Sequence, residues 1–258
     1  MDIIETAAAA GIRKAKQNPV IYRLWYLLYR RNTGVRIQWF NAGTALYVDG
    51  YPRSGNTFAQ FLIKNLWPAV EFVHHFHAIA PLKIALKRNI PTFVLFRYPA
   101  AAISSNYIKT FAMRGCSSPL QIQTDLRFLR ELTKSYADYY QFVSENTDYL
   151  KLIDFEMLIS DPDNVMLSIN QEISEQLQLQ RHAIIRRVNE IKDREFGARD
   201  PLGSSKPSPD KEHAKDTLID AVGQFKEYDI CLKLHESLKE TSRAQHASNS
   251  CSEGLGDC

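Results

Sequence analysis

The sequence predicts an α/β fold, a parallel β-sheet with helices on both faces; the alternation of elements predicts the sheet, and composition and charge balance indicate a globular domain. Short apolar strands bounded by glycine or proline alternate with longer segments of helical period, a pattern typical of parallel sheets. The composition, 45% hydrophobic and 24% charged, is that of a globular protein, and 258 residues suffice for one substantial core. Charge is nearly balanced, with 32 Lys and Arg against 29 Asp and Glu, which argues against a nucleic-acid partner.

Residues 1–40 are predicted to form a helical N-terminal arm, with two helices that meet at Asn18-Pro19. Residues 20–31 are strongly apolar but contain arginine, and they fall short of the roughly 20 apolar residues of a spanning helix. No small-residue cleavage site follows, so the segment is not a signal peptide. It has the pattern of an interfacial helix that touches a membrane, yet packing on its own domain or on a partner subunit is the favoured interpretation.

Residues 41–242 are predicted to form one α/β domain. Its first strand is expected at 45–49, between two glycines, and its first helix at 57–66, where four apolar side chains share one face. A second helix is expected at 80–88. The strand at 92–96 follows a proline, and the helix at 99–111 begins with one.

The second half of the domain is predicted to be mostly helical. A long helix is expected at 120–143 and a strand at 149–154, followed by helices that a Gly/Ser/Pro-rich loop interrupts at 197–209. Residues 243–258 are small and polar and are expected to form a disordered tail.

The strongest local signal is the segment Gly50-Tyr-Pro-Arg-Ser-Gly-Asn-Thr57, which follows a predicted strand and opens a helix. Backbone N–H groups and the helix dipole make such a turn an anion site. Its two glycines have the spacing of a P-loop, but Asn56 stands where that motif has lysine, and the cation is Arg53. The alternative is a turn that merely needs glycine.

The segment 50–58 resembles the 5′-phosphosulfate loop of sulfotransferases, enzymes that use 3′-phosphoadenosine 5′-phosphosulfate (PAPS) as sulfuryl donor. The resemblance implies a P-loop-type sheet with donor-binding groups at the ends of its strands. The residues that it assigns to donor binding are Arg53, Ser54, Gly55, Asn56, Thr57 and, near the adenine, Phe58.

Two further segments resemble elements of the same family. In residues 93–105, Arg97 ends a strand and Ser105 follows eight residues later, as in the family's 3′-phosphate element, although Tyr98 replaces the usual Asp or Asn. A guanidinium and a hydroxyl are suitable phosphate donors. In residues 150–162, Phe155 stands where the family often has an adenine-contacting tyrosine; core packing is the alternative.

Three histidines lie between the two phosphate elements, in Phe72-Val-His-His-Phe-His77. Transfer to a hydroxyl needs a base, and histidine has a suitable pKa. The family's cytosolic branch has its histidine base between the same elements, which implies His77 as the base here, with His75 as the second choice. On an extended segment these two side chains share one face. A structural role and a metal site are the alternatives.

The C-terminal half departs from the family, because the Gly-x-x-Gly-x-Trp-Lys element that closes over the donor is absent. The nearest substitute is the segment 197–206, where Lys206 or Arg199 is expected to reach the 3′-phosphate and a solvated loop charge is the alternative.

The four cysteines form no metal-ligand spacing and indicate free thiols in a reducing compartment. The sequence therefore predicts a cytoplasmic sulfotransferase that uses PAPS without a metal, with a small-molecule or carbohydrate acceptor. The rival hypotheses are a P-loop phosphotransferase, with Asp154 at a strand end as its magnesium ligand, and a noncatalytic nucleotide- or anion-binding protein. The sequence identifies neither the acceptor nor the oligomeric state.

Overall fold

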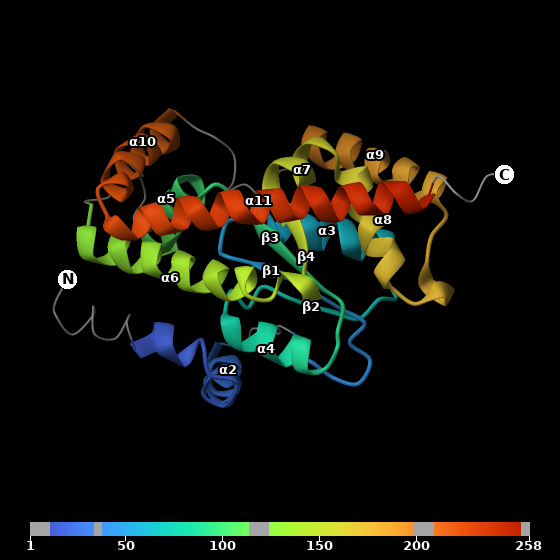
Figure 1. Cartoon of the computed structure of the whole chain (residues 1–258), viewed down its shortest axis with the longest axis horizontal. Coiled ribbons are helices and arrows are strands. Elements are labelled where there is room, and N and C mark those ends of the chain that lie inside the picture. The colour runs from blue at the N-terminus through green and yellow to red at the C-terminus, as the bar shows by residue number, and fades with distance from the viewer. Residues whose placement is uncertain (1–10, 34–37, 114–123, 199–208, 254–258) are drawn as a thin grey trace.

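The computed structural model describes residues 11–33, 38–113, 124–198 and 209–253. Its centre is a parallel sheet of four strands in the order β2-β1-β3-β4 (Figure 1). The strands are β1 (Leu46–Gly50), β2 (Phe72–His74), β3 (Thr92–Phe96) and β4 (Lys151–Asp154). The predicted α/β class with a parallel sheet is confirmed.

Helices connect the strands and continue beyond them. The first half of the chain contributes α2 (Pro19–Thr33), α3 (Asn56–Leu66), α4 (Ile79–Lys87) and α5 (Pro99–Met113). The second half contributes α6 (Leu126–Ser144), α7 (Phe155–Ser160), α8 (Pro162–Glu172), α9 (Arg181–Ala198), α10 (Pro209–Gly223) and α11 (Lys226–Glu253).

Alternate residues of each strand enter two separate apolar cores, one on each face of the sheet. In β1, Tyr47 joins the core under α4, α5, α6 and α11, whereas Leu46 and Val48 join the core under α3, α8 and α9. The strands are buried on both faces, as parallel strands usually are. The expected coverage of both faces by helices is therefore confirmed.

The structure differs from the sequence predictions at two elements. β2 was not predicted, because a three-residue strand that ends in histidine gives no periodic signal. The predicted disordered tail is wrong for residues 243–253, since α11 continues to Glu253. There the Gln245 amide donates to the carbonyls of Thr147 (3.2 Å) and Leu150 (2.8 Å) and accepts from the Leu152 N–H (2.9 Å). Residues 254–258 lie outside the described part.

The N-terminal arm packs on the domain through one side of α2. Tyr22 and Tyr26 are buried, and both rings contact Trp39 and Phe76. No helix in the described ranges is long and apolar enough to cross a membrane.

Candidate functional site

The sheet order places a crevice where the first and third strands end. From β1 the chain crosses first to β2 on one side and later to β3 on the other, so the direction of winding reverses between β1 and β3. Ligands of open parallel sheets bind outside the carboxyl ends of the strands at this reversal. Gly50 ends β1 there and Arg97 follows β3, so the two predicted phosphate elements meet at one edge.

Glycine is required at both ends of the loop that follows β1. A Cβ on Gly50 would lie 2.2 Å from the carbonyl oxygen of Leu95, so only glycine lets β1 lie this close to β3. Gly55 has φ 93°, a left-handed conformation that favours glycine, and it caps α3 without a side-chain hydrogen bond. The first N–H groups of α3 therefore lack a side-chain cap, as an anion site at a helix N-terminus requires.

Two arginines meet beside this loop. The Arg53 Nε donates to Ser105 Oγ at 2.9 Å, and Arg97 Nη1 donates to the carbonyl oxygen of Arg53 at 3.2 Å. The Arg97 guanidinium also lies 4.1 Å from the centre of the Phe155 ring. These four residues, predicted from three separate segments, therefore form one cluster.

The cluster carries positive charge that no described carboxylate pairs with. Within the described ranges neither Arg53 nor Arg97 forms an ion pair. Burial lowers the pKa of Arg53. Burial also lowers the pKa of Arg97, with Glu156 and Glu212 acting against it and Arg53 in the same direction. Two half-buried cations that repel each other are stabilised by a bound anion. Arg53 also has φ 73°, a strained conformation of the kind that clusters at functional sites.

The remaining predicted loop residues have different surroundings. The Ser54 hydroxyl is fully buried 3.1 Å from the Tyr140 hydroxyl, and the Asn56 amide donates to the carbonyl of Tyr51 at 3.1 Å, so both hold the loop together. Thr57 is exposed at the start of α3. Phe58 packs against the core beneath α3. Arg199 and Lys206 lie outside the described residues.

His77 is held at the end of β1, next to the loop. Its Nδ1 lies 2.7 Å from the carbonyl oxygen of Gly50 and 3.1 Å from Asp49 Oδ1, and its backbone N–H donates to Asp49 Oδ2 at 2.7 Å. A carbonyl oxygen can only accept, so Nδ1 carries a proton, and in the neutral ring Nε2 holds the lone pair. The Nε2 atom has no hydrogen bond to a described residue, and the side chain is 22% exposed. His77 is therefore oriented as a proton acceptor.

Asp49 was missed by the sequence analysis. Its carboxylate is fully buried and also accepts a hydrogen bond from the Tyr47 hydroxyl at 2.7 Å. Burial raises the pKa of this carboxyl, but attraction to the His77 ring when that ring is protonated, together with the hydrogen bonds from His77 and Tyr47, outweighs burial and holds the pKa below its usual value. An ionised Asp49 would stabilise the imidazolium of His77 once that ring had taken a proton. The available signal was an acidic residue inside an otherwise apolar strand.

His74 and His75 form a separate chain of hydrogen bonds. The Gln60 Nε2 donates to His74 Nε2 (2.9 Å), so the proton of His74 is on Nδ1 and is donated to His75 Nδ1 (2.8 Å). The proton of His75 is then on Nε2 and is donated to Thr57 Oγ1 at 3.2 Å. Both nitrogens of His75 are thereby engaged, which favours His77 over His75 as the base.

The segment is not extended as the sequence suggested, because His75 and His77 have φ of 63° and 50°. This left-handed backbone turns the chain after β2 and places the His77 ring against the end of β1. The described residues contain no group of three His, Cys, Asp or Glu side chains that could hold a metal ion.

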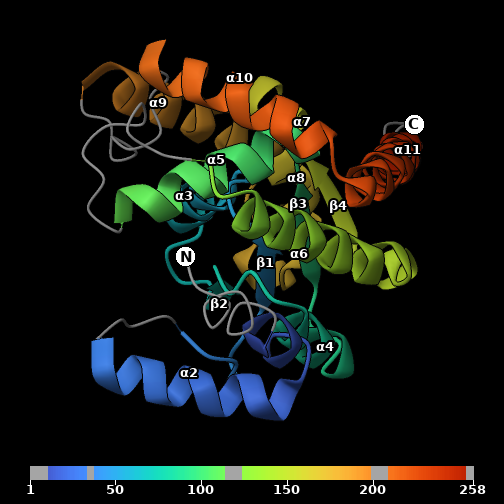
Figure 2. The same ribbon diagram turned by 90° about the vertical axis from the view of Figure 1, so that its left-hand side faces the viewer.

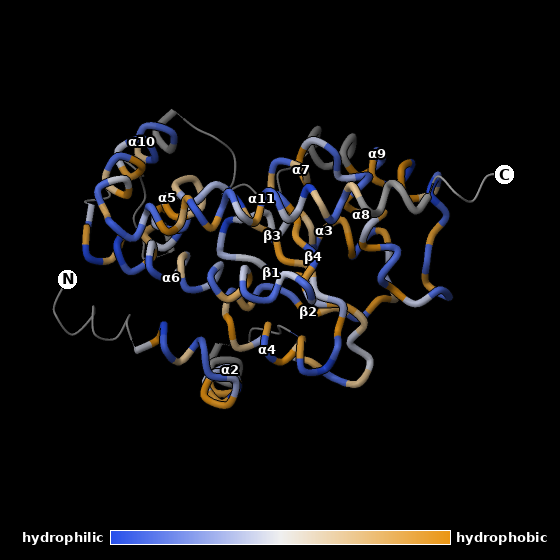
Figure 3. Tube along the Cα trace, viewed as in Figure 1, coloured by the Kyte–Doolittle hydropathy of each residue, from blue (hydrophilic) through white to orange (hydrophobic). Residues whose placement is uncertain are grey.

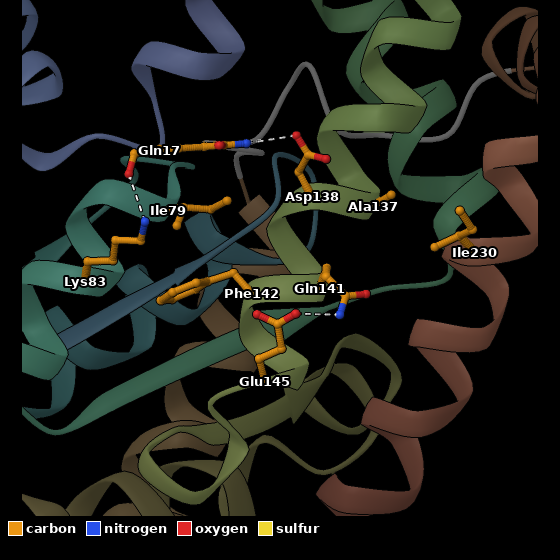
Figure 4. A pocket seen from close by; sticks show the side chains of 9 residues that line it. All are labelled: Gln17, Ile79, Lys83, Ala137, Asp138, Gln141, Phe142, Glu145 and Ile230. Atoms are coloured by element: carbon orange, nitrogen blue, oxygen red, sulfur yellow. Dashed lines mark hydrogen bonds between the residues drawn. The ribbon is translucent and has the colours of Figure 1, made fainter.

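A surface groove of about 390 Å³ between α4 and α6 lies elsewhere on the molecule (Figure 4). Its polar side chains form hydrogen bonds with one another or with the backbone. Lys83 donates to the carbonyl of Gln17, Gln17 to Asp138, and Gln141 to Glu145. None of the predicted site residues lines it.

Comparisons with solved structures found seven protein chains that resemble this one. No protein-family model matches the chain, and no curated protein matches its sequence. The structure of mouse sulfotransferase SULT7A1 complexed with PAP aligns with 77% of this chain and 90% of its own, at a TM-score of 0.47 and 11% identity.

Proposed function

We propose that this protein is a sulfotransferase that moves a sulfuryl group from PAPS to an acceptor hydroxyl or amine. The observation that carries the proposal is the position of His77. The His77 ring lies at the start of a loop that has an open helix N-terminus, near Arg53 and Arg97, neither of which forms an ion pair with a described carboxylate. A base beside an anion site is what transfer of an anionic group to a hydroxyl requires.

Different residues of the chain would bind the donor and stabilise the leaving group. PAPS, when bound, supplies the sulfuryl group. The N–H groups at the start of α3 would hold the 5′ side of the donor, and Arg97 with Ser105 would hold the 3′-phosphate, with Phe155 beside the Arg97 plane. Arg53 is always protonated, so it would stabilise charge on the departing oxygen by donating hydrogen bonds.

His77 would take the proton of the acceptor on Nε2 as the acceptor oxygen attacks sulfur. Its Nδ1 proton stays with the Gly50 carbonyl, and the Asp49 carboxylate compensates the positive charge that appears on the ring. The S–O bond to the donor phosphate breaks with its electron pair left on that phosphate. No proton needs to leave Nδ1 during the step.

The phosphotransferase hypothesis is less well supported. Its magnesium ligand was expected at Asp154, but Oδ1 of that carboxylate accepts the N–H of Glu156 and caps α7. Asn56, which replaces the P-loop lysine, donates to the backbone of its own loop. A noncatalytic binding protein would not need the histidine that the Gly50 carbonyl and Asp49 orient.

Two measurements on the full chain test the proposal. Calorimetry without magnesium should give at least tenfold tighter binding of 3′-phosphoadenosine 5′-phosphate than of AMP. Both nucleotides have a 5′-phosphate, but only the first has the 3′-phosphate that Arg97 would bind. Equal affinities would refute donor recognition. Radiolabelled transfer from PAPS to a panel of hydroxyl acceptors and a metabolite extract then separates an enzyme from a binding protein.

The base is tested with two matched variants. Asparagine tolerates the left-handed backbone at both positions, so His77→Asn and His75→Asn should both fold. His77→Asn should lower turnover by about 10²–10⁴-fold with little change in nucleotide affinity. His75→Asn should stay within about tenfold of the wild type. The reverse ranking would assign the base to His75.

A further inference from the structure

The side of α2 that faces away from the domain carries a row of solvent-exposed aliphatic side chains. Val20, Leu24 and Leu28 follow one another at four-residue spacing on this helix and are 78%, 61% and 54% exposed. Ile21 and Leu27, each 52% exposed, widen the row. Figure 3 shows the apolar colouring of this helix at the edge of the molecule. Contiguous exposed apolar surface of this kind marks an interaction site.

A groove of about 600 Å³ runs beside this row, between α2 and α4. Leu24 and Leu27 line it together with three cations, Arg23 from α2 and Lys87 and Arg88 from the end of α4. None of the three forms an ion pair with another residue in the described ranges. The groove has no acidic residue in its lining.

The first half of the sequence, which contains α2 and α4, is strongly positive. Residues 1–124 contain 15 Lys and Arg against 4 Asp and Glu, a net charge of +11, whereas residues 125–258 contain 17 against 25, a net charge of −8. No acidic residue occurs between positions 6 and 48. α2 and α4 lie together at one end of the molecule, away from α9, α10 and α11 (Figure 2).

We propose that this face, defined by the exposed side chains of α2 and the cations of the adjoining groove, docks on the surface of an anionic membrane. Such a surface offers both partners that the face needs, an apolar boundary for the aliphatic row and negative headgroups for the cations. A nucleic acid would leave the aliphatic side chains without a partner. Two copies of this face would bring like charges together, which disfavours a dimer through it.

The proposal makes α2 an interfacial helix rather than a spanning one. Its inner side stays on the domain, where Tyr22 donates to the carbonyl of Phe76 at 3.0 Å and Tyr26 stacks on Trp39. The variants that test docking must therefore change the outer side chains alone. Val20, Leu24 and Leu28 can be replaced without disturbing that contact, because they are more than half exposed.

Flotation of the full chain with lipid vesicles tests the proposal at low salt. The probes are vesicles of phosphatidylcholine alone and of phosphatidylcholine with about 30% phosphatidylglycerol. The chain should float with the anionic vesicles and bind the neutral ones at least tenfold more weakly. The triple variant Val20→Ser, Leu24→Ser, Leu28→Ser should bind anionic vesicles at least tenfold more weakly, and each of Arg23→Gln, Lys87→Gln and Arg88→Gln about fivefold more weakly.

The control changes two other exposed aliphatic side chains outside α2, Ile159→Ser (45% exposed) with Ile230→Ser (49% exposed), and should float as the wild type does. Circular dichroism checks that all variants fold. Failure of the wild type to float with anionic vesicles would overturn the proposal, as would equal flotation of the triple variant and the control. A dimer in sedimentation equilibrium that the triple variant abolishes, without vesicle binding, would assign the face to a second copy and also overturn it. None of these readouts depends on transfer activity.

Discussion

Single residues at the end of β1 decide whether His77 can act as a base. The buried Asp49 carboxylate lies 3.1 Å from His77 Nδ1 and is positioned to stabilise the imidazolium rather than to take its proton. Asp49→Asn keeps the volume and removes the charge. We expect transfer to fall about 10- to 100-fold while nucleotide affinity stays within about twofold, because the lost interaction acts after the proton moves.

Single-turnover transfer and calorimetry on the same preparation measure the two effects. Tyr47→Phe is the matched control, since it removes a hydrogen bond from Asp49 Oδ2 but leaves the carboxylate charged. Its effect on transfer should be smaller. A fully active Asp49→Asn protein would mean that the Gly50 carbonyl alone orients the ring.

The paired histidines should make the fold sensitive to acid. Burial, assisted by the neighbouring His75 charge, lowers the pKa of His74 to about 3, and burial with the His77 charge lowers the pKa of His75 to about 4. In the unfolded chain the pKa of histidine is about 6.5. The unfolded state therefore binds more protons below that pH, and stability should fall as the pH drops from about 6.5 towards 4.

Urea unfolding at pH 7 and pH 5 measures this loss. We expect it to be on the order of 1 kcal/mol per histidine at pH 5, after allowance for solvent screening at these half-buried rings. His75→Asn should reduce the difference between the two pH values. An unchanged difference in that variant would place the acid-sensitive groups elsewhere.

At the scale of elements, the close approach of β1 to β3 requires glycine at position 50, where the loop after β1 begins. A Cβ at Gly50 would lie 2.2 Å from the Leu95 carbonyl oxygen, and the backbone of a central strand has little freedom to move away. Gly50→Ala should cost about 3 kcal/mol of unfolding free energy or prevent folding.

Gly223→Ala is the control, because a Cβ there meets no atom within 4 Å and Gly223 ends a helix at ordinary φ. It should leave stability unchanged or raise it by about 0.4–1 kcal/mol. Chemical denaturation of both variants decides the point. A stable Gly50→Ala protein would show that the two strands can separate without loss of the sheet.

The sequence predicted the elements that have a clear period and missed those that depend on contacts. The strands near 46–50, 92–96 and 151–154 and the helices between them were expected from apolar patterning. β2 has only three residues and pairs with β1 alone, so its existence follows from the sheet rather than from its own side chains. The contact between Arg53 and Ser105 was likewise not predictable from the sequence, although each of the two residues was predicted to bind the donor.

At the scale of the whole molecule, one parallel sheet brings distant segments to a common edge. The three segments that were recognised separately, 50–58, 93–105 and 150–162, lie at the ends of neighbouring strands, so Arg53, Arg97 and Phe155 become neighbours. That convergence was predictable from strand–helix alternation. The orientation of His77 was not, because it depends on left-handed backbone at two histidines and on a carboxylate in the core of β1.

The end of the chain covers an open edge of that sheet. β4 is an edge strand, and its Leu152 donates its N–H to Gln245 and accepts from the Ser242 hydroxyl at 3.1 Å, so α11 satisfies backbone groups that another strand would otherwise pair. Edge strands left uncovered invite association with other chains. This contact explains why α11 extends past residue 242, where the sequence predicted the domain to end.

Shortening the chain tests this role of α11. A chain that ends at residue 242 loses all three hydrogen bonds of Gln245, and we expect a loss of about 2–3 kcal/mol in unfolding free energy together with concentration-dependent aggregation. Gln245→Ala should lose about half as much, because water can reach part of the exposed edge. A chain that ends at residue 253 keeps every described contact and is the control. Urea unfolding and light scattering measure both effects, and equal stability of the 242- and 253-residue chains would mean that helices before Ser242 already protect β4.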